Sequence, residues 1–275
     1  MLSRARVPEV ERRSIAVCAD PCGVAHDPSA GVLYVADAYT GAILCVDHDR
    51  QHRIATIEAG GALAGDRIGG LARAPHGTLF ATVIGNGRAG AIVRVELDGR
   101  VEPIDGLPPQ PRRLGVTYDA REHALYTTQH QASRHGPHDG SIVAIDLVTG
   151  APSTVLDGFA RPVGIAKLGS LLVVTDARQR AVFRVELVAG RAVRRLQLAG
   201  DIDRPDSVCA CGADSVLVTA YDDDTRCGSV HRIWLDGRRA AIIARGPWEP
   251  RGVATDGVRA FVATRRSGRV LVLDL

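Results

Sequence analysis

Short apolar runs recur along the chain and alternate with turn-forming residues. The first three runs are Gly23–His26, Leu33–Asp37 and Ile43–Asp47, and their length and composition are typical of strands. A small residue followed by an apolar one opens each repeat, and this pair occurs six times, 43 to 49 residues apart. The six pairs are Gly23-Val24, Gly70-Leu71, Gly115-Val116, Gly164-Ile165, Ser207-Val208 and Gly252-Val253. A repeat made of strands, with a period in the forties, is typical of the blades of a β-propeller.

Each repeat has room for four strands, and turns such as Asp98-Gly99 and Asp236-Gly237 follow the third strand, as hairpins require. Small residues are frequent in the first strand, which we expect to line a crowded central channel. The sixth repeat ends after its third strand, whereas an additional strand at 13–19 precedes the first repeat. We expect this N-terminal strand to become the outer strand of the last blade, which closes the ring and removes two exposed sheet edges.

The pattern therefore predicts an all-β fold, a six-bladed β-propeller that occupies residues 1–275 as one domain. The expected blades lie near 20–60, 66–105, 111–157, 160–199, 203–245 and 248–275, the last completed by 13–19.

Composition argues against several classes of function, including nucleic-acid binding and membrane insertion. A net charge of +3 gives no reason to expect a nucleic-acid partner, and no run approaches the 18 apolar residues of a membrane span. Residues 1–13 lack the pattern of a signal peptide, so we expect a cytoplasmic protein whose six cysteines are free thiols. Phosphate-binding, dinucleotide-binding and serine-nucleophile motifs are absent from the sequence, and the oligomeric state is left open.

The position just before each small residue defines an inner ring of side chains at the expected channel mouth. Its members are Cys22, Gly69, Leu114, Val163, Asp206 and Arg251. An apolar wall facing the polar Cys-Asp-Arg group predicts a pocket for a small-molecule substrate. The alternative is that Asp206 only holds loop amides and that Cys22 packs as a small apolar residue.

Two residues earlier lies an outer ring in which four of six positions are arginine: Asp20, Arg67, Arg112, Arg161, Arg204 and Glu249. Arginines that meet at a concave mouth favour a carboxylate or phosphate ligand. The ends of the second strands add further polar candidates. The predicted substrate contacts are Asp20, Arg67, Arg113 (the neighbour of ring residue Arg112), Arg161, Arg204, Asp37, Asp176, Tyr221 and Arg265. The alternative is that the arginines are solvated charges paired with Asp20, Glu249, Asp37 or Asp176.

Two expected loops are unusual. Residues 130–139 contain three histidines and an aspartate, a composition that can bind metal or transfer protons, although a mobile polar lid explains it equally well. Residues 222–224 are three consecutive aspartates, but they lack the spaced oxygens of a calcium loop. No cofactor is predicted, and Asp20 and Asp206 are only weak candidates for a divalent metal.

The repeat Pro-x-Gly-Val-Ala-x-Asp…Leu-Tyr-Val-Ala-Asp, at 21–37, resembles the NHL-repeat propellers and the related gluconolactonase (senescence-marker-protein) and strictosidine-synthase-like proteins. Residues 204–209 with 218–221 are similar to the lactonase segment that supplies a metal-binding aspartate and general base, a role that the resemblance gives to Asp206. The lactonase glutamate corresponds to Asp20, and its asparagines correspond to Leu114 and Val163. Streptogramin lyases, which use histidine chemistry, are a further analogy.

Three hypotheses follow. The first is a metal-independent hydrolase, lyase or isomerase of a small polar or anionic metabolite, with Asp206 as general acid or base, Arg251 stabilising negative charge and His130 assisting proton transfer. In this enzyme Cys22 is a candidate nucleophile if Arg251 lowers its pKa. The second is a metal-dependent, lactonase-like hydrolase that uses Asp20 and Asp206. The third is a non-catalytic propeller that binds a protein or peptide.

Overall fold

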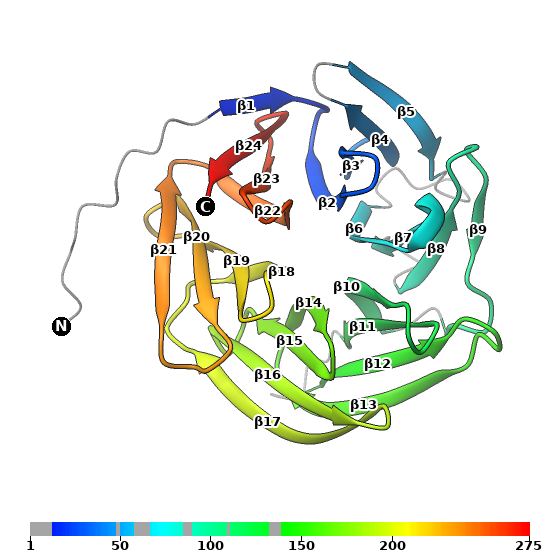
Figure 1. Cartoon of the computed structure of the whole chain (residues 1–275), viewed down its shortest axis with the longest axis vertical. Helices are drawn as coiled ribbons and strands as arrows, with labels where there is room; N and C mark the ends of the chain where they lie inside the picture. Colours follow the sequence, from blue (N-terminus) through cyan, green and yellow to red (C-terminus); the bar gives the residue numbers. More distant parts are fainter. Residues whose placement is uncertain (1–12, 48–49, 58–66, 85–89, 109–110, 132–138) are drawn as a thin grey trace.

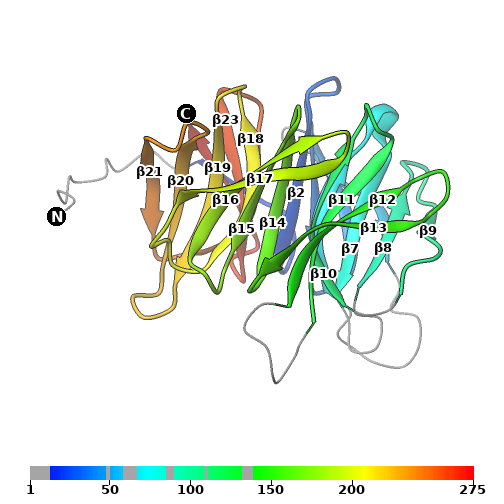
Figure 2. The ribbon, with the colours of Figure 1, turned by 90° about the horizontal axis from the view of Figure 1, so that it is seen from below.

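The computed structural model describes residues 13–47, 50–57, 67–84, 90–108, 111–131 and 139–275. Their strands form six antiparallel four-stranded sheets arranged in a ring around a central axis (Figure 1). Seen from the side, the strands of the sheets run between the two faces of the ring (Figure 2). The innermost strands contact one another in ring order, β2 to β6, β10, β14, β18, β22 and back to β2. Within the described residues, no helix has the length and hydropathy needed to span a membrane.

The strand bounds follow the predicted repeat. Blade one contains β2 (Pro21–Asp27), β3 (Val32–Asp37), β4 (Ala42–Asp47) and β5 (Arg50–Thr56). Blade two contains β6 (Arg67–Arg73), β7 (Leu79–Ile84), β8 (Ala91–Val95) and β9 (Val101–Pro103), with the short 3-10 helix η1 (Pro75–Gly77). Blade three contains β10 (Arg112–Asp119), β11 (Ala124–His130), β12 (Gly140–Asp146) and β13 (Pro152–Phe159).

The remaining blades have the same order. Blade four contains β14 (Pro162–Leu168), β15 (Leu171–Asp176), β16 (Ala181–Val188) and β17 (Arg191–Ala199). Blade five contains β18 (Pro205–Cys211), β19 (Ser215–Asp222), β20 (Cys227–Trp234) and β21 (Ala240–Gly246). Blade six contains β22 (Glu249–Thr255), β23 (Arg259–Arg265), β24 (Arg269–Asp274) and the N-terminal β1 (Arg13–Ala16).

The ring is closed by β1, which confirms the prediction made from the incomplete sixth repeat. This strand pairs antiparallel with β24, from Arg13 opposite Val272 to Ala16 opposite Arg269. Figure 1 shows the two ends of the described chain side by side in this blade. The first and last strands of the described residues therefore share one sheet, and both would otherwise leave an unpaired edge.

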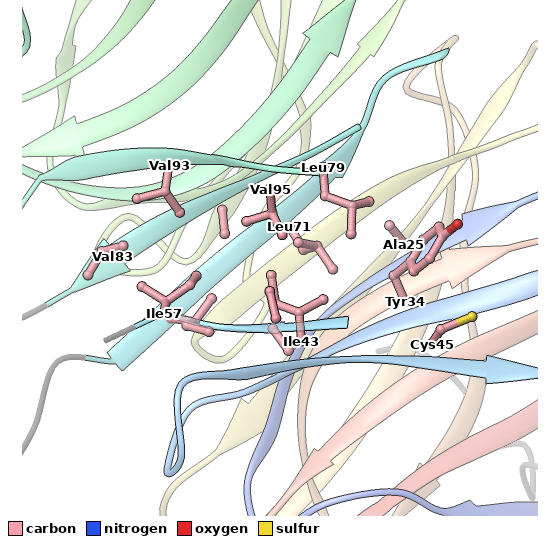
Figure 3. Close-up of a cluster of buried hydrophobic side chains, with 14 of the residues drawn as sticks. Ala25, Tyr34, Ile43, Cys45, Ile57, Leu71, Leu79, Val83, Val93 and Val95 are labelled. Carbon is pink, nitrogen blue, oxygen red and sulfur yellow. The ribbon is translucent and has the colours of Figure 1, made fainter. Parts of the chain in front are cut away.

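Apolar side chains fill the spaces between neighbouring blades. Between blades one and two, Ala25, Tyr34 and Ile43 pack against Leu71 and Val93 (Figure 3). Because side chains alternate along each strand, every blade buries one row of residues against each of its two neighbours. The hydrophobic core therefore consists of separate clusters between neighbouring blades. The centre of the ring is not part of this core, and the side chains of the innermost strands line it.

Glycines in the innermost strands allow neighbouring backbones to approach each other closely. A Cβ atom on Gly115 would lie 2.3 Å from the carbonyl oxygen of Val163, and one on Gly252 would lie 2.3 Å from that of Cys22. Our expectation attributed the small residues to crowding in the channel. The structure instead shows that the next blade's backbone excludes a larger residue.

Buried threonines join four pairs of adjacent blades. The hydroxyl of Thr128 accepts from the amide of Gly115, 2.9 Å away, and donates to the carbonyl of Val163 on the next blade at 2.6 Å. Three equivalent residues donate to the next blade in the same way: Thr82, Thr175 and Thr219. The corresponding positions in blades one and six are Ala36 and Ala263, so the two junctions of blade one lack this bridge.

Candidate functional site

A central cavity of about 570 Å³ lies along the ring axis and is enclosed by the six innermost strands. Each of these strands has a bulge at the same place, for example between Pro205 and Val208 in β18. The inner-ring residue is the first residue of that bulge, and a bulge redirects a side chain out of the regular alternation. All six inner-ring positions line the cavity, as predicted: Cys22, Gly69, Leu114, Val163, Asp206 and Arg251.

Asp206 and Arg251 form an ion pair on the cavity wall. The Nη1 atom of Arg251 lies 2.7 Å from Oδ2 of Asp206, and the two side chains are 30% and 20% exposed. Thr175 donates to the backbone carbonyl of Asp206, and Thr219 donates to that of Arg251, so the threonine bridges hold both backbones in place. Burial opposes the charge on Arg251, but the carboxylate of Asp206 outweighs it and raises the pKa of Arg251. The pair is therefore fixed in position.

Glu249, at the start of β22, is the carboxylate shared by three arginines. Its Oε1 atom lies 2.8 Å from Arg204, 3.1 Å from Arg251 and 3.4 Å from Arg265. Burial opposes ionisation of Glu249, but Arg251, Arg265 and Arg204 outweigh it and hold the pKa of Glu249 below its usual value. The alternative interpretation of the outer ring named Glu249 as an ion-pair partner of its arginines, and Arg204 confirms this. The sharing of Glu249 by three arginines could not be read from the sequence.

The network continues across the junction of blades six and one and outward on blade five. Arg265 lies 3.8 Å from Asp20, and the backbone amide of Arg266 donates to Asp20. Arg204 also pairs with Asp223 at 2.6 Å, and its guanidinium lies 4.7 Å from the ring centre of Tyr221. We call the six charged residues around the mouth on blades five, six and one the charged arc: Asp20, Arg204, Asp206, Glu249, Arg251 and Arg265.

Arg112 and Arg161 lie on the opposite side of the mouth, in blades three and four. Both line the cavity and both are exposed. Neither forms an ion pair with any residue of the described part of the chain. The side chain of the outer-ring residue Arg67 lies outside the described residues. Two cationic groups thus line the cavity without an ion-pair partner among the described residues.

Cys22 lines the cavity, but its surroundings do not produce a nucleophile. The thiol donates to the carbonyl oxygens of Ile68 at 3.1 Å and Ala36 at 3.3 Å. Burial raises the pKa of Cys22 strongly, and Arg251 does not reverse this. These contacts therefore do not support the hypothesis of a thiolate activated by Arg251. The thiol instead joins blades one and two, where Ala36 leaves no threonine hydroxyl.

Arg113 does not contact the cavity. It is 1% exposed, and its guanidinium donates to the carbonyls of Gly90 and Pro108, the latter at 3.0 Å. Burial lowers the pKa of Arg113. The prediction that Arg113 binds substrate is corrected, because Arg112 and Leu114 point to the channel and the intervening side chain points between blades.

Asp37 and Asp176 are buried turn residues rather than substrate contacts. The carboxylate of Asp37 accepts from the amide of Asp20 at 3.0 Å and from the hydroxyl of Thr40 at 2.7 Å. Asp176 accepts from the amide of Arg161 at 3.0 Å. These carboxylates have no access to the cavity, which corrects our prediction, but they fix the backbones from which Asp20 and Arg161 project.

His130 ends β11 and is half-buried, and it is not among the residues that line the cavity. Burial lowers the pKa of His130, and the positive charge of Arg161 adds to this effect. The other two histidines of its loop, His135 and His138, lie outside the described residues. The geometry therefore gives His130 no contact with Asp206 or Arg251.

The described residues do not fit a lactonase-type divalent centre. They contain no group of three or more His, Cys, Asp or Glu side chains placed to hold a metal ion. The two candidate ligands are already paired with cations, Asp20 with Arg265 and Asp206 with Arg251. The remaining positions of the lactonase pattern carry the apolar side chains of Leu114 and Val163. We therefore derive no step that uses a metal.

These features define a six-bladed β-propeller with a charged central cavity. Its structure matches gluconolactonases and the related regucalcin at low sequence identity. A gluconolactonase from Xanthomonas campestris is 16% identical, with a TM-score of 0.77 over 98% of this chain and 91% of that chain. The calcium-binding protein regucalcin from Agrobacterium tumefaciens is 15% identical, with a TM-score of 0.68 over 95% of this chain and 90% of that chain.

A propeller lyase has the same architecture. Virginiamycin B lyase from Staphylococcus aureus is 14% identical, with a TM-score of 0.65 over 97% of this chain and all of that chain (100%). The sequence matches no protein-family model and no curated protein. At these identities the similarity establishes the fold, and the chemistry must be argued from the site.

Proposed function

We propose that this protein is an enzyme, a hydrolase, lyase or isomerase, that acts on a small polar or anionic molecule in the central cavity. The observation that carries the proposal is the Asp206–Arg251 ion pair on the cavity wall, across from the exposed Arg112 and Arg161, which form no ion pair within the described ranges. The propeller architecture is shared with a lactonase and a lyase, which is consistent with this class. The apolar wall at Leu114 and Val163 supplies the contact surface that a ligand cavity needs.

In this proposal, two arginines bind the substrate and the Asp206–Arg251 pair carries out the reaction. Arg112 and Arg161 bind a carboxylate or phosphate of the substrate, because guanidinium groups donate paired hydrogen bonds to such oxygens. Asp206 accepts a proton from the reacting carbon or from an attacking water. Arg251 already lies at hydrogen-bonding distance from Asp206 and would stabilise the negative charge that develops on the substrate. Neither Cys22 nor His130 is needed in this scheme.

Anion binding is the first test. Acetate, gluconate, citrate and inorganic phosphate would be titrated into the protein and into an Arg112→Gln/Arg161→Gln double variant, with binding measured by calorimetry and by thermal shift. We expect at least one anion to bind the wild type and to bind the double variant about tenfold or more weakly. Arg100→Gln, which removes an exposed arginine outside the cavity, is the control and should change nothing. Equal binding by all three proteins would contradict the proposal.

Catalysis is the second test. Aldonolactones and other small esters would be assayed by acid release, with and without a chelator, for the wild type and for Asp206→Asn. We expect turnover that resists the chelator and falls at least about a hundredfold in the variant, whose fold is checked by its melting curve. Full activity in Asp206→Asn would refute the general-base role. Loss of activity with chelator would favour the metal-dependent alternative, and anion binding without any turnover would favour the non-catalytic one.

A further inference from the structure

Ser207 is the exception among the six small residues that open the repeats. The other five are glycines: Gly23, Gly70, Gly115, Gly164 and Gly252. A Cβ atom on any of these glycines would lie 2.3 to 2.9 Å from a backbone carbonyl oxygen of the next blade. Ser207 carries both a Cβ atom and a hydroxyl at the same position. The junction of blades five and six therefore has space for a side chain that the other five junctions exclude.

The hydroxyl of Ser207 lies between the two strands that carry the Asp206–Arg251 ion pair. Ser207 follows Asp206 in β18, and its Oγ atom accepts from the backbone amide of Val253 in β22, 3.4 Å away. Val253 comes two residues after Arg251, and β18 and β22 are neighbouring innermost strands (Figure 1). Ser207 is half-buried and lines the central cavity. Its hydroxyl is therefore part of the cavity wall next to the ion pair.

This hydroxyl has a hydrogen-bond donor that the protein does not use. A serine hydroxyl can donate one hydrogen bond and accept two. The contact with Val253 uses an acceptor position, and the O–H group donates to no residue in the ranges that the structure covers. Thr219, at the same junction, instead donates its hydroxyl to the backbone carbonyl of Arg251. A ligand in the cavity can therefore accept from Ser207 without displacing an existing contact.

The charge of the neighbouring groups indicates which ligand atom Ser207 would contact. A carboxylate or phosphate binds most strongly to guanidinium groups, and Arg112 and Arg161 supply these elsewhere on the cavity wall. The O–H group of Ser207 is neutral and lies beside the negative carboxylate of Asp206. This position favours an uncharged oxygen, a hydroxyl or a carbonyl, over a second anionic group.

We propose that Ser207 is a substrate-binding residue whose hydroxyl donates to an uncharged oxygen of the substrate, on the part that lies against Asp206. The inference rests on the proposed function for the location of the site. It adds a substrate class, namely an anion that carries hydroxyl or carbonyl oxygens away from its charged end. An anion with a plain alkyl chain cannot accept from Ser207.

Two carboxylates with carbon chains of equal length test this contact. Gluconate carries a hydroxyl on every carbon apart from its carboxylate, whereas hexanoate carries none, so the comparison requires no assumption about which carbon lies at Ser207. Both would be titrated by calorimetry into the wild type and into Ser207→Ala, which keeps the Cβ atom and removes the hydroxyl. We expect the variant to bind gluconate about fivefold or more weakly and to change hexanoate binding by less than about twofold.

Ser207→Gly separates the hydroxyl from the space that the side chain fills. This variant carries the residue found at the same position in the other five blades, so we expect it to fold. It should lose as much gluconate affinity as Ser207→Ala, because both variants lack the donor. Ser153→Ala is the matched control, since Ser153 is exposed and does not line the cavity, and its gluconate affinity should equal that of the wild type. A melting curve of each variant shows that it is folded.

The outcomes separate this inference from the proposed function. An unchanged gluconate affinity in Ser207→Ala, or an equal loss for gluconate and hexanoate, would overturn the contact. A loss in Ser207→Ala that Ser207→Gly does not share would overturn it as well. A wild type that binds phosphate but not gluconate would refute the role of Ser207 and leave the anion site standing. Gluconate binding that depends on Ser207, in a protein with no turnover, would uphold the contact and refute the enzyme.

Discussion

Replacing Glu249 with glutamine would remove one charge and leave the side-chain shape almost unchanged. The wild-type carboxylate stands within 2.8 to 3.4 Å of Arg204, Arg251 and Arg265, and its side chain is 15% exposed. An amide cannot balance three guanidinium groups that stay together at the mouth of the cavity. We therefore expect Glu249→Gln to destabilise the protein and, because the mouth becomes more positive, to bind anions more tightly.

The expected loss lies between the values for exposed and for buried ion pairs. Removing one partner of a fully buried pair costs about 3–5 kcal/mol, and an exposed pair contributes about 0–1 kcal/mol. For a carboxylate that water partly reaches, we expect a loss of about 1–3 kcal/mol, which lowers the melting temperature by about 3–8 °C. Glu102→Gln is the control, because Glu102 pairs with Arg100 alone and is 47% exposed; its change should stay within about 0.5 kcal/mol.

The difference in stability between the wild type and Glu249→Gln should depend on pH, which provides a second test of this prediction. Because the folded pKa of Glu249 is lower than the usual 4.5, the stability that its charge supplies is fully present above that value. It disappears as the pH falls through the lower folded pKa. Urea unfolding of wild type and variant should therefore differ at pH 7 and converge as the pH falls below about 4.5. Equal stability at pH 7, or a difference that persists at acid pH, would refute the role of the Glu249 charge.

Three further predictions concern the ring. Thr128→Val leaves two buried backbone groups without partners and should cost about 2–4 kcal/mol by urea unfolding, whereas Thr128→Ser should keep most of the stability. Gly115→Ala places a Cβ 2.3 Å from the carbonyl of Val163 and should lower the melting temperature by about 5 °C or more; an unchanged value would contradict the proposed crowding. Cys22, a half-buried thiol that is hydrogen-bonded to two carbonyls and has a raised pKa, should react more slowly with iodoacetamide at pH 8 than after unfolding, as peptide mass analysis would show.

The fold could be predicted because the same pattern of strands and turns occurs six times in the sequence. One repeat of three or four short strands is an ambiguous signal, but the recurrence of a small residue at regular spacing removes the ambiguity and also counts the blades. The same alignment located the inner ring correctly, since every bulge occurs at the same point of the repeat. The missing fourth strand of the last repeat predicted the role of β1.

The site was predicted less well. The repeat gives the position of a side chain in its blade, but it does not give the residues that this side chain contacts. Because side chains alternate along a strand, Arg112 lies at the channel whereas its neighbour Arg113 lies between blades. An alignment that is wrong by one residue therefore assigns the wrong arginine to the channel. Asp37 is acidic, as a site residue should be, but its carboxylate is used by its own turn. The contacts of Glu249 join residues from different blades, and such contacts depend on the depth and rotamers of side chains rather than on their spacing.

One junction within the charged arc, that of blades six and one, lacks a threonine bridge. Ala263 and Ala36 leave both junctions of blade one without the hydroxyl that joins the other blades. At the junction of blades six and one, Arg265 and the backbone amide of Arg266 contact Asp20 instead. The charges at the mouth thus help to close the ring, and all of them except Glu249 also line the cavity, so an anion that binds them should stabilise the folded protein through the same contacts. Substitutions in the charged arc must therefore be interpreted with stability and binding measured on the same variant. Arg112 and Arg161 form no ion pair between blades within the described ranges, so their substitution should affect binding more than stability.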